Sequence, residues 1–400
     1  MTDSERVVYE LIKKSFPSFW SYLNPLNARR RELCDVLVVC DPDIIIFSIK
    51  EIEYKDTGRP KVDVERWKRK AIDASSKQVY GAERQLVTQS EVITRDGKVA
   101  LPFPADANKN IYRVAIALGS KEKVPLIFGD FGKGFVHVFD ETSLEILLSE
   151  LDTISDFLKY LSVKQNWFES GKISISSTEE DLLAFYLTQD CSLPSEPSLV
   201  VLEAGLWERF SSLPEVISRK ESDQTSYIWD NLIERVYENY ATNNYRTPWA
   251  NDFKELSDAE RVVRAMARED RQMRQQLGAS VLDLRERSGF GARVLDAIGS
   301  PVRYVVMTAD YDSNRELNFK ELQARCLVAR GLDHSKQIVI GILMELTTRH
   351  SGDAVSLCYL GVRDWTPEWQ EKMDLYQNEL GFFLNLRGKI QNKANMSSSA

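Results

Sequence analysis

Three polar residues lie at the ends of two short apolar segments, at positions where a packed sheet usually carries valine or isoleucine. The segments are CDVLVVC (34–40) and DIIIFSIK (43–50), and the polar residues are Asp35, Ser48 and Lys50. Because strand side chains alternate between faces, Ser48 and Lys50 share a face to which Asp35 can also point. A carboxylate can hold Mg²⁺ or Mn²⁺, and a nearby ammonium can orient water or stabilise charge on a phosphate. This combination predicts hydrolysis of a phosphodiester.

These residues require a sheet and two helices to position them. Residues 4–16 show the apolar spacing of an amphipathic helix. The two β-branched segments are separated by DPD and predict neighbouring strands. Asp63 is predicted to cap a long helix that runs to about residue 87. Strands within 110–140 and one or two helices within 143–163 complete an α/β module over residues 1–165.

The order of these elements and their polar residues resembles the PD-(D/E)XK nuclease superfamily, nearest to its Mrr-like and NERD-like branches. The matching residues are Glu10 on the first helix, Asp35, Lys50, and Gln78 on the long helix. The resemblance covers about the first 90 residues clearly. It implies a restriction-endonuclease-like domain with a mixed sheet flanked by helices, and a Mg²⁺- or Mn²⁺-dependent nuclease acting on DNA.

The chain departs from the family motif at Ser48, where the motif has an acidic residue two positions before the lysine. In a subgroup of restriction endonucleases with Ser-x-Lys, the following helix supplies the missing carboxylate. Asp63 and Glu65 lie at that distance here, and Glu65 is preferred because Asp63 is assigned to the helix cap. The expected metal ligands are therefore Asp35, Glu65 and Glu10, while Glu51 and Glu53 are alternatives. Catalytic roles are expected for Asp35, Ser48, Lys50 and Glu65.

Basic residues are concentrated near the amino terminus although the whole chain carries a net charge of -8. The first hundred residues hold 18 Lys/Arg and 16 Asp/Glu, or +2, which leaves -10 for the remainder. Two clusters flank the predicted site, and a solvated surface is the alternative interpretation of both. The residues expected to contact DNA are Gln78 and the clustered Arg29, Arg30, Arg31, Arg66, Lys68, Arg69 and Lys70.

Beyond residue 165 the patterns change. Residues 166–298 are predicted to form a mainly helical segment, 299–390 a small α/β domain, and 391–400 a disordered tail. The acidic carboxy-terminal half predicts a homo-oligomer or a protein partner. The amino terminus has no signal-peptide pattern and no apolar run reaches membrane-spanning length, which predicts a cytoplasmic protein without a membrane partner. The five scattered cysteines predict reduced, mostly buried thiols.

Other chemistries match the sequence less well. The segment GDFGKGF (129–135) lacks the spacing of a phosphate-binding loop and predicts a hairpin turn. The three histidines are far apart and form no zinc motif. The leading hypothesis is therefore a metal-dependent DNA nuclease, and the family analogy suggests bacterial defence against foreign DNA. Ser48 motivates the alternative, a catalytically inactive nuclease fold that binds DNA or acts as an assembly scaffold.

Overall fold

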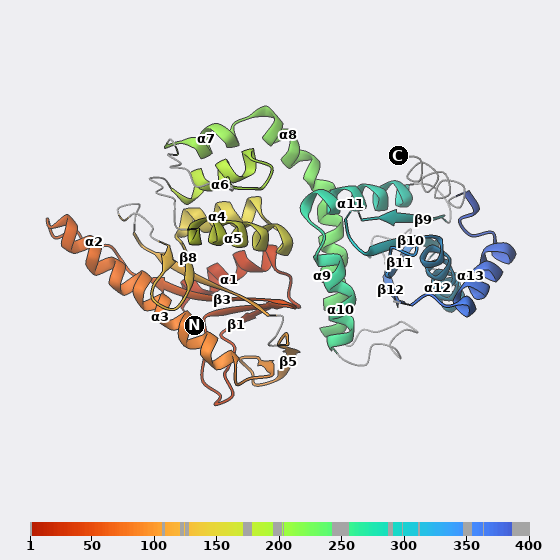
Figure 1. Ribbon diagram of the computed structural model, residues 1–400, viewed down its shortest axis with the longest axis horizontal. Coiled ribbons are helices and arrows are strands. Elements are labelled where there is room, and N and C mark those ends of the chain that lie inside the picture. Colours follow the sequence, from red (N-terminus) through yellow and green to blue (C-terminus); the bar gives the residue numbers. More distant parts are fainter. Residues whose placement is uncertain are drawn as a thin grey trace. The chain divides into compact units, whose positions relative to one another are not determined.

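The chain divides into two compact units, Met1–Glu221 and Ser222–Ala400, in a computed structural model (Figure 1). Both units contain helices and strands, so the predicted α/β class is confirmed. The structure describes residues 2–105, 109–120, 124, 128–170, 178–194, 202, 204–241, 256–286, 291–297, 299–310, 313–346, 354–362 and 364–385.

The first unit is built around a mixed sheet of six strands. Strands β1, β2 and β3 are antiparallel neighbours, β6 and β8 continue the sheet in parallel with β3, and β7 pairs antiparallel with β8. In sheet order the strands are β1 (Ser21–Leu23), β2 (Val36–Cys40), β3 (Asp43–Glu51), β6 (Asn110–Leu118), β8 (Phe135–Phe139) and β7 (Gly129–Asp130). A separate hairpin joins β4 (Glu91–Ile93) to β5 (Val99–Pro102).

Helices cover both faces of this sheet, which explains why β2 and most of β3 are buried on both sides. One face contacts α1 (Asp3–Ser15), α4 (Glu141–Glu150) and α5 (Ile154–Glu169). The other contacts a continuous helical run, seen in Figure 1, that consists of α2 (Pro60–Lys68), a π-helical turn η1 (Arg69–Asp73) and α3 (Ala74–Leu86). Leu37, Ile44 and Ile46 pack with Trp67 and Val79 on this second face.

Three further helices complete the first unit: α6 (Glu179–Thr188), α7 (Leu206–Ser211) and α8 (Pro214–Ser222). A buried ion pair joins α5 to α6. Lys164 is fully buried, pairs with Glu179, and places its ammonium 3.8 Å from the centre of the Phe128 ring. The Tyr160 hydroxyl also donates to Glu179, at 2.6 Å. The two charges therefore compensate each other inside an aromatic environment.

The second unit holds a four-stranded sheet with helices on both faces. Strands β10 and β11 are parallel, and β9 and β12 flank them antiparallel. Trp229 and Tyr304 pack edge to face on one side, while Cys326 and Leu322 lie against Gly341 on the other. Its elements are η2 (Asp223–Ser226), α9 (Tyr227–Ala241), α10 (Leu256–Ala267), α11 (Arg271–Glu286), β9 (Gly291–Asp296), β10 (Val302–Asp310), α12 (Arg315–Leu332), β11 (Ile338–Leu346), β12 (Ala354–Gly361) and α13 (Pro367–Leu380).

The two-unit division differs from the expected separate helical domain over 166–298. Helix α6 contacts α4 and so belongs to the first unit, whereas α9 and α11 contact the strands of the second. Residues 291–296 lie within the segment predicted to be mainly helical, but they form β9, because they pair with β10 along its open edge. Residues 302–361 follow a β-α-β-β order and a final helix, α13, comes after them, in agreement with the small α/β region expected there. The predicted tail 391–400 lies outside the described residues.

The cysteines match a further expectation. All five cysteines are free, and four are buried. Among the helices of the described residues, none combines the length and the apolar character that crossing a membrane requires.

The buried pair provides a test of the core. We expect Lys164→Met to destabilise the protein by about 3–5 kcal/mol, because Glu179 would keep its charge without the ammonium partner. Urea unfolding measures this loss. The control Lys159→Met removes an exposed lysine from the same helix and should change stability by less than about 0.5 kcal/mol. Equal losses in the two variants would show that the pair is not what stabilises this region.

Candidate active site

The side chain of Gln78 on α3 connects two of the residues that the sequence places at the site. Its amide oxygen accepts a hydrogen bond of 3.0 Å from the Ser48 hydroxyl. Its amide nitrogen donates to Asp35 Oδ1, also at 3.0 Å. Asp35, Ser48 and Gln78 are far apart in the chain, yet they form one hydrogen-bonded row on the face of the sheet that α3 covers. The expected shared face is confirmed.

The position of Asp35 follows from how β2 begins. Val36 is the first residue of β2 and pairs with Phe47, so Asp35 lies just before the strand and beside Ser48. Its Oδ2 accepts the backbone N–H of Ile49 at 2.5 Å. The carboxylate thus serves as the acceptor that the backbone of β2 would otherwise supply to β3. This contact holds the Asp35 side chain at the end of the sheet.

Burial and charge act on Asp35 in opposite directions. The residue is only 2% exposed, and this burial raises the pKa of its carboxyl above the ordinary value. The Ile49 N–H, the positive charge of Lys50 and the Gln78 amide lower the pKa, and the charge of Glu5 raises it again. Lys50 is half-buried and forms no ion pair with any residue in the described ranges. Its ammonium is therefore available to an external anion.

The donor set is compatible with a magnesium ion that also binds substrate. An ionised carboxylate has about four lone-pair positions, and Asp35 uses two of them, for Ile49 and Gln78. Mg²⁺ commonly takes one or two protein carboxylates and completes its shell with water and phosphate oxygens. The described part of the chain contains no group of three or more His, Cys, Asp or Glu side chains that could hold a metal. A site with few protein ligands remains the arrangement that fits.

Glu65 is not brought to Asp35. It is exposed on α2, thirteen residues before Gln78 in the same helical run. At about 1.5 Å per residue, this separation is roughly 20 Å along the helix. Because two ligands of one ion must both lie within about 2–2.5 Å of it, Glu65 cannot share a metal with Asp35. The two alternative ligands also lie elsewhere. Glu51 points to the opposite face of the sheet and contacts the Ser4 hydroxyl, and Glu53 follows the end of β3.

The first helix offers a different glutamate from the one expected. Glu10 is exposed and lies about 200° around the helix from the buried Val8. Glu5 lies only about 60° from Val8, and its charge affects the pKa of both Asp35 and Glu32. Glu5 is therefore the acidic residue of α1 whose charge affects the Asp35 pKa, while its carboxylate accepts the Thr2 N–H at 2.9 Å in the helix cap. The i, i+3 spacing of Glu5 and Val8 was the signal that could have identified it.

Asp63 does not cap the long helix. The helix begins at Pro60, its N-cap Arg59 provides no side-chain bond, and Asp63 lies in the first turn. The Asp63 carboxylate instead accepts bonds from the backbone N–H and hydroxyl of Thr57, at 2.7 and 2.8 Å. These bonds and the contact with Arg66 lower its pKa and attach the loop after β3 to the helix.

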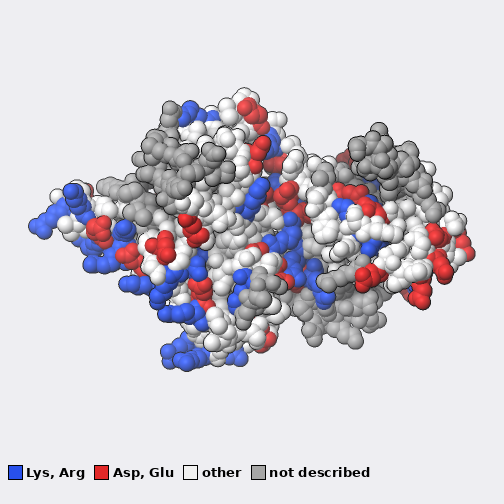
Figure 2. Space-filling view, viewed as in Figure 1, with Lys and Arg blue, Asp and Glu red and all other residues white. Residues whose placement is uncertain are grey.

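The two predicted basic clusters have different local structures. Asn27 Oδ1 accepts the backbone N–H groups of Arg29 and Arg31, which forms an exposed turn. Arg30 donates to the carbonyl of Gly97. The second cluster lies on the helical run, where Arg69 and Lys70 are exposed and Arg66 and Lys68 are half-buried. Figure 2 shows Lys and Arg side chains along the helical run α2–α3.

Comparison of the chain with protein-family models, with curated proteins and with solved structures gave no match. The resemblance to PD-(D/E)XK nucleases therefore rests on the motif residues, and the functional argument rests on their geometry.

We expect Asp35→Asn to remain folded in the presence of EDTA. The new amide can keep its oxygen on the Ile49 N–H, and reversal of the Gln78 amide would then satisfy both Gln78 and Ser48. Because burial raises the pKa of Asp35, its ionised form destabilises the folded state, and this cost is absent below the ordinary Asp pKa. The stability of Asp35→Asn relative to wild type should therefore increase as pH rises through the raised pKa.

Thermal unfolding between pH 4 and pH 8 measures this trend. Asp35→Ala is the comparison, because it leaves the Ile49 N–H without its acceptor and should cost about 1–3 kcal/mol. A relative stability of Asp35→Asn that falls with rising pH would contradict the assignment.

Proposed function

We propose that the first unit is a metal-dependent nuclease of restriction-endonuclease-like fold that hydrolyses phosphodiester bonds in DNA. The observation that carries this proposal is the row of Asp35, Ser48 and Gln78, with Lys50 on the same strand as Ser48 and without an ion pair among the described residues. A strand, its neighbour and a helix contribute these groups at the end of one sheet. A purely structural carboxylate would explain the bonds of Asp35, but it would not explain an available ammonium beside it.

Each residue has a specific role in this proposal. Asp35 would hold Mg²⁺ or Mn²⁺, which polarises the phosphoryl oxygen and lowers the pKa of the attacking water. Lys50 would bind the phosphate and stabilise the charge that develops on its oxygens. Ser48 and Gln78 keep the Asp35 carboxylate in place through their hydrogen bonds. At the position where the family motif has an acidic metal ligand, this chain therefore has Ser48, which positions Asp35 instead.

The helical run α2–α3 is the proposed contact surface for DNA. Its residues Pro60–Leu86 include seven Lys/Arg and four Asp/Glu, a net charge of +3, in a chain whose net charge is -8. Salt should therefore weaken binding, because the phosphate contacts release counterions. The second unit, Ser222–Ala400, holds 23 Lys/Arg and 25 Asp/Glu, a net charge of -2, and is proposed to bind a protein partner or a second copy of the chain.

One observation favours a second candidate, a nuclease-like domain that binds DNA without cutting it. Ser48 occupies the position of the second carboxylate, and the described residues contain no three-ligand metal group. In this case the same basic surface would bind DNA, while the Asp35 row would only stabilise the sheet and helix.

The deciding experiment is cleavage of supercoiled and linear DNA with Mg²⁺ or Mn²⁺. We expect Asp35→Asn and Lys50→Ala to lower the rate by about 10²–10³-fold or more, because each removes a group that acts on the reacting phosphate. Gln78→Ala should lower it by about 10–100-fold, since it only positions Asp35. Addition of EDTA should stop the reaction.

Glu10→Gln and Glu65→Gln are the matched controls, because each neutralises an exposed glutamate away from the Asp35 row. Both should retain the wild-type rate. Cleavage that survives in Asp35→Asn would refute this active site. Salt-sensitive DNA binding without metal-dependent cleavage would select the second candidate.

A further inference from the structure

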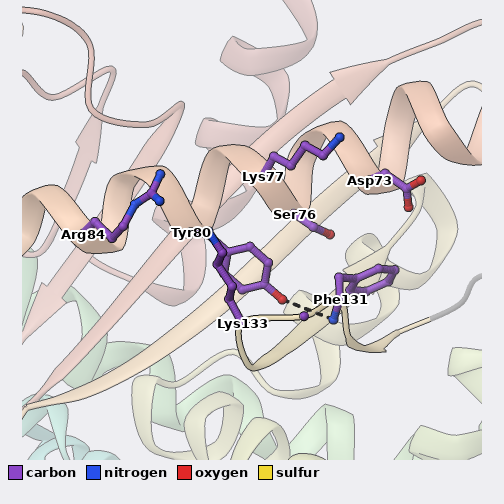
Figure 3. A pocket seen from close by; sticks show the side chains of 8 residues that line it. Asp73, Ser76, Lys77, Tyr80, Arg84, Phe131 and Lys133 are labelled. Atoms are coloured by element: carbon purple, nitrogen blue, oxygen red, sulfur yellow. Dashed lines mark hydrogen bonds between the residues drawn. The ribbon is translucent and has the colours of Figure 1, made fainter.

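A pocket of about 630 Å³ lies between α3 and the loop that joins β7 to β8 (Figure 3). On α3 its wall includes Lys77, Tyr80 and Arg84, which recur at the i, i+3 and i+7 spacing of one helix face. Gln78 is displaced by about 100° from Lys77 around the same helix and does not line the pocket. The pocket is therefore distinct from the row of residues at Asp35.

Hydrogen bonds hold the loop wall in place. The Tyr80 hydroxyl donates to the Gly134 carbonyl at 2.5 Å and accepts the Phe131 N–H at 3.2 Å. Asp130 accepts the N–H groups of Gly132 and Gly134, at 2.6 and 2.9 Å. Both glycines have φ values near +100°, which other residues rarely adopt. The loop is thus attached to α3 before any ligand binds.

The pocket carries positive charge that no ion pair within the described residues neutralises. Lys77, Arg84 and Lys133 line it and are exposed, and none of them forms an ion pair with another residue of the described ranges. Asp73 is the single carboxylate in the lining. Three unpaired cations around one hollow are suited to an anion with several oxygens, such as a phosphate chain.

An aromatic ring, that of Phe131, also lines the pocket. Phe131 is half-buried in the loop wall, and Figure 3 shows it on the side of the pocket that faces Tyr80. Base stacking on an aromatic side chain is a common way to bind a nucleotide without reading its sequence. The volume lies within the range of about 300–1,000 Å³ typical of small-ligand pockets. Asp73 could accept hydrogen bonds from the sugar hydroxyls or an amino group of the base.

We propose that this pocket binds a nucleotide unit, with its phosphates on Lys77, Arg84 and Lys133 and its base stacked on Phe131. The same chemistry is offered by a free nucleotide and by the unpaired 5′-phosphorylated end of a DNA strand. The proposal goes beyond the nuclease activity and does not depend on it.

Isothermal titration of the full-length protein tests the proposal with three probes: ATP, inorganic triphosphate and a 5′-phosphorylated tetrathymidylate. Wild-type protein should bind ATP or the oligonucleotide, and more weakly as salt is raised. Lys133→Glu should weaken binding at least about tenfold, since reversing one charge replaces an attraction by a repulsion. Lys14→Glu makes the same change on the exposed end of α1 and should have no effect.

The variant Phe131→Ala distinguishes the contribution of the base to binding affinity from that of the phosphates. It should weaken ATP binding by about five- to a hundredfold, while triphosphate binding stays unchanged. Circular dichroism and thermal unfolding establish that each variant is folded. Binding of the oligonucleotide alone would identify a strand end as the ligand, and binding of ATP alone a free nucleotide.

Two results would overturn the proposal: no binding of ATP or oligonucleotide up to about 1 mM, or binding that Lys133→Glu leaves intact. Loss of ATP affinity equal to loss of triphosphate affinity in Phe131→Ala would refute the stacking. Asp35→Asn should bind all probes as wild type does, so that failure of the nuclease proposal and failure of this one are distinguishable.

Discussion

The buried carboxylate of Asp35 is the constraint on which the centre of the first unit depends. An ionised carboxyl without hydrogen-bond partners in such a place is costly, so both of its oxygens require donors. One donor is the Ile49 N–H, which requires the observed register of β2 and β3, and the other is the Gln78 amide, which requires α3 on the same face. A one-residue slip of β3 would move Ser48 and Lys50 to the other face of the sheet. The register, the helix position and the site are thus one arrangement.

The helical run from Pro60 to Leu86 has faces with different surroundings. Trp67 is buried and donates its indole N–H to the Ile52 carbonyl, which attaches α2 to the end of β3. Gln78 reaches Asp35, and Lys77 lines the pocket one residue earlier in the chain. The π-helical turn Arg69–Asp73 lies between α2 and α3. Such turns shift the phase of the helix, so the apolar face of α2 does not continue into α3 at regular spacing.

The two sites that share α3 have opposite electrostatic character. The Asp35 centre presents a carboxylate that is suited to a cation, whereas the pocket is lined by Lys77, Arg84 and Lys133, which form no ion pair with the described part of the chain and are suited to an anion. The two lie on different faces of one helix, and each is completed by a different part of the sheet: the β2 and β3 ends for Asp35, the β7 to β8 loop for the pocket. A variant in one site can therefore be made without replacing a residue of the other.

The sequence alone determined the strands and helix that carry the Asp35 row and the faces to which their side chains point. Alternation along β3 places Ser48 and Lys50 on one face, and helical periodicity predicted the α3 helix that carries Gln78. Only the tertiary structure decided what those side chains meet. Glu65 was an acceptable ligand by spacing, but the length of the helix carries it roughly 20 Å from Gln78. Glu5 rather than Glu10 is the acidic residue of α1 whose charge affects the Asp35 pKa, because packing against the sheet selected one face of α1. The pocket beside Tyr80 was not predicted, because its two walls are separated by about fifty residues and only folding brings them together. Local patterns specify which way a side chain points, whereas distances between elements depend on packing that no short segment encodes.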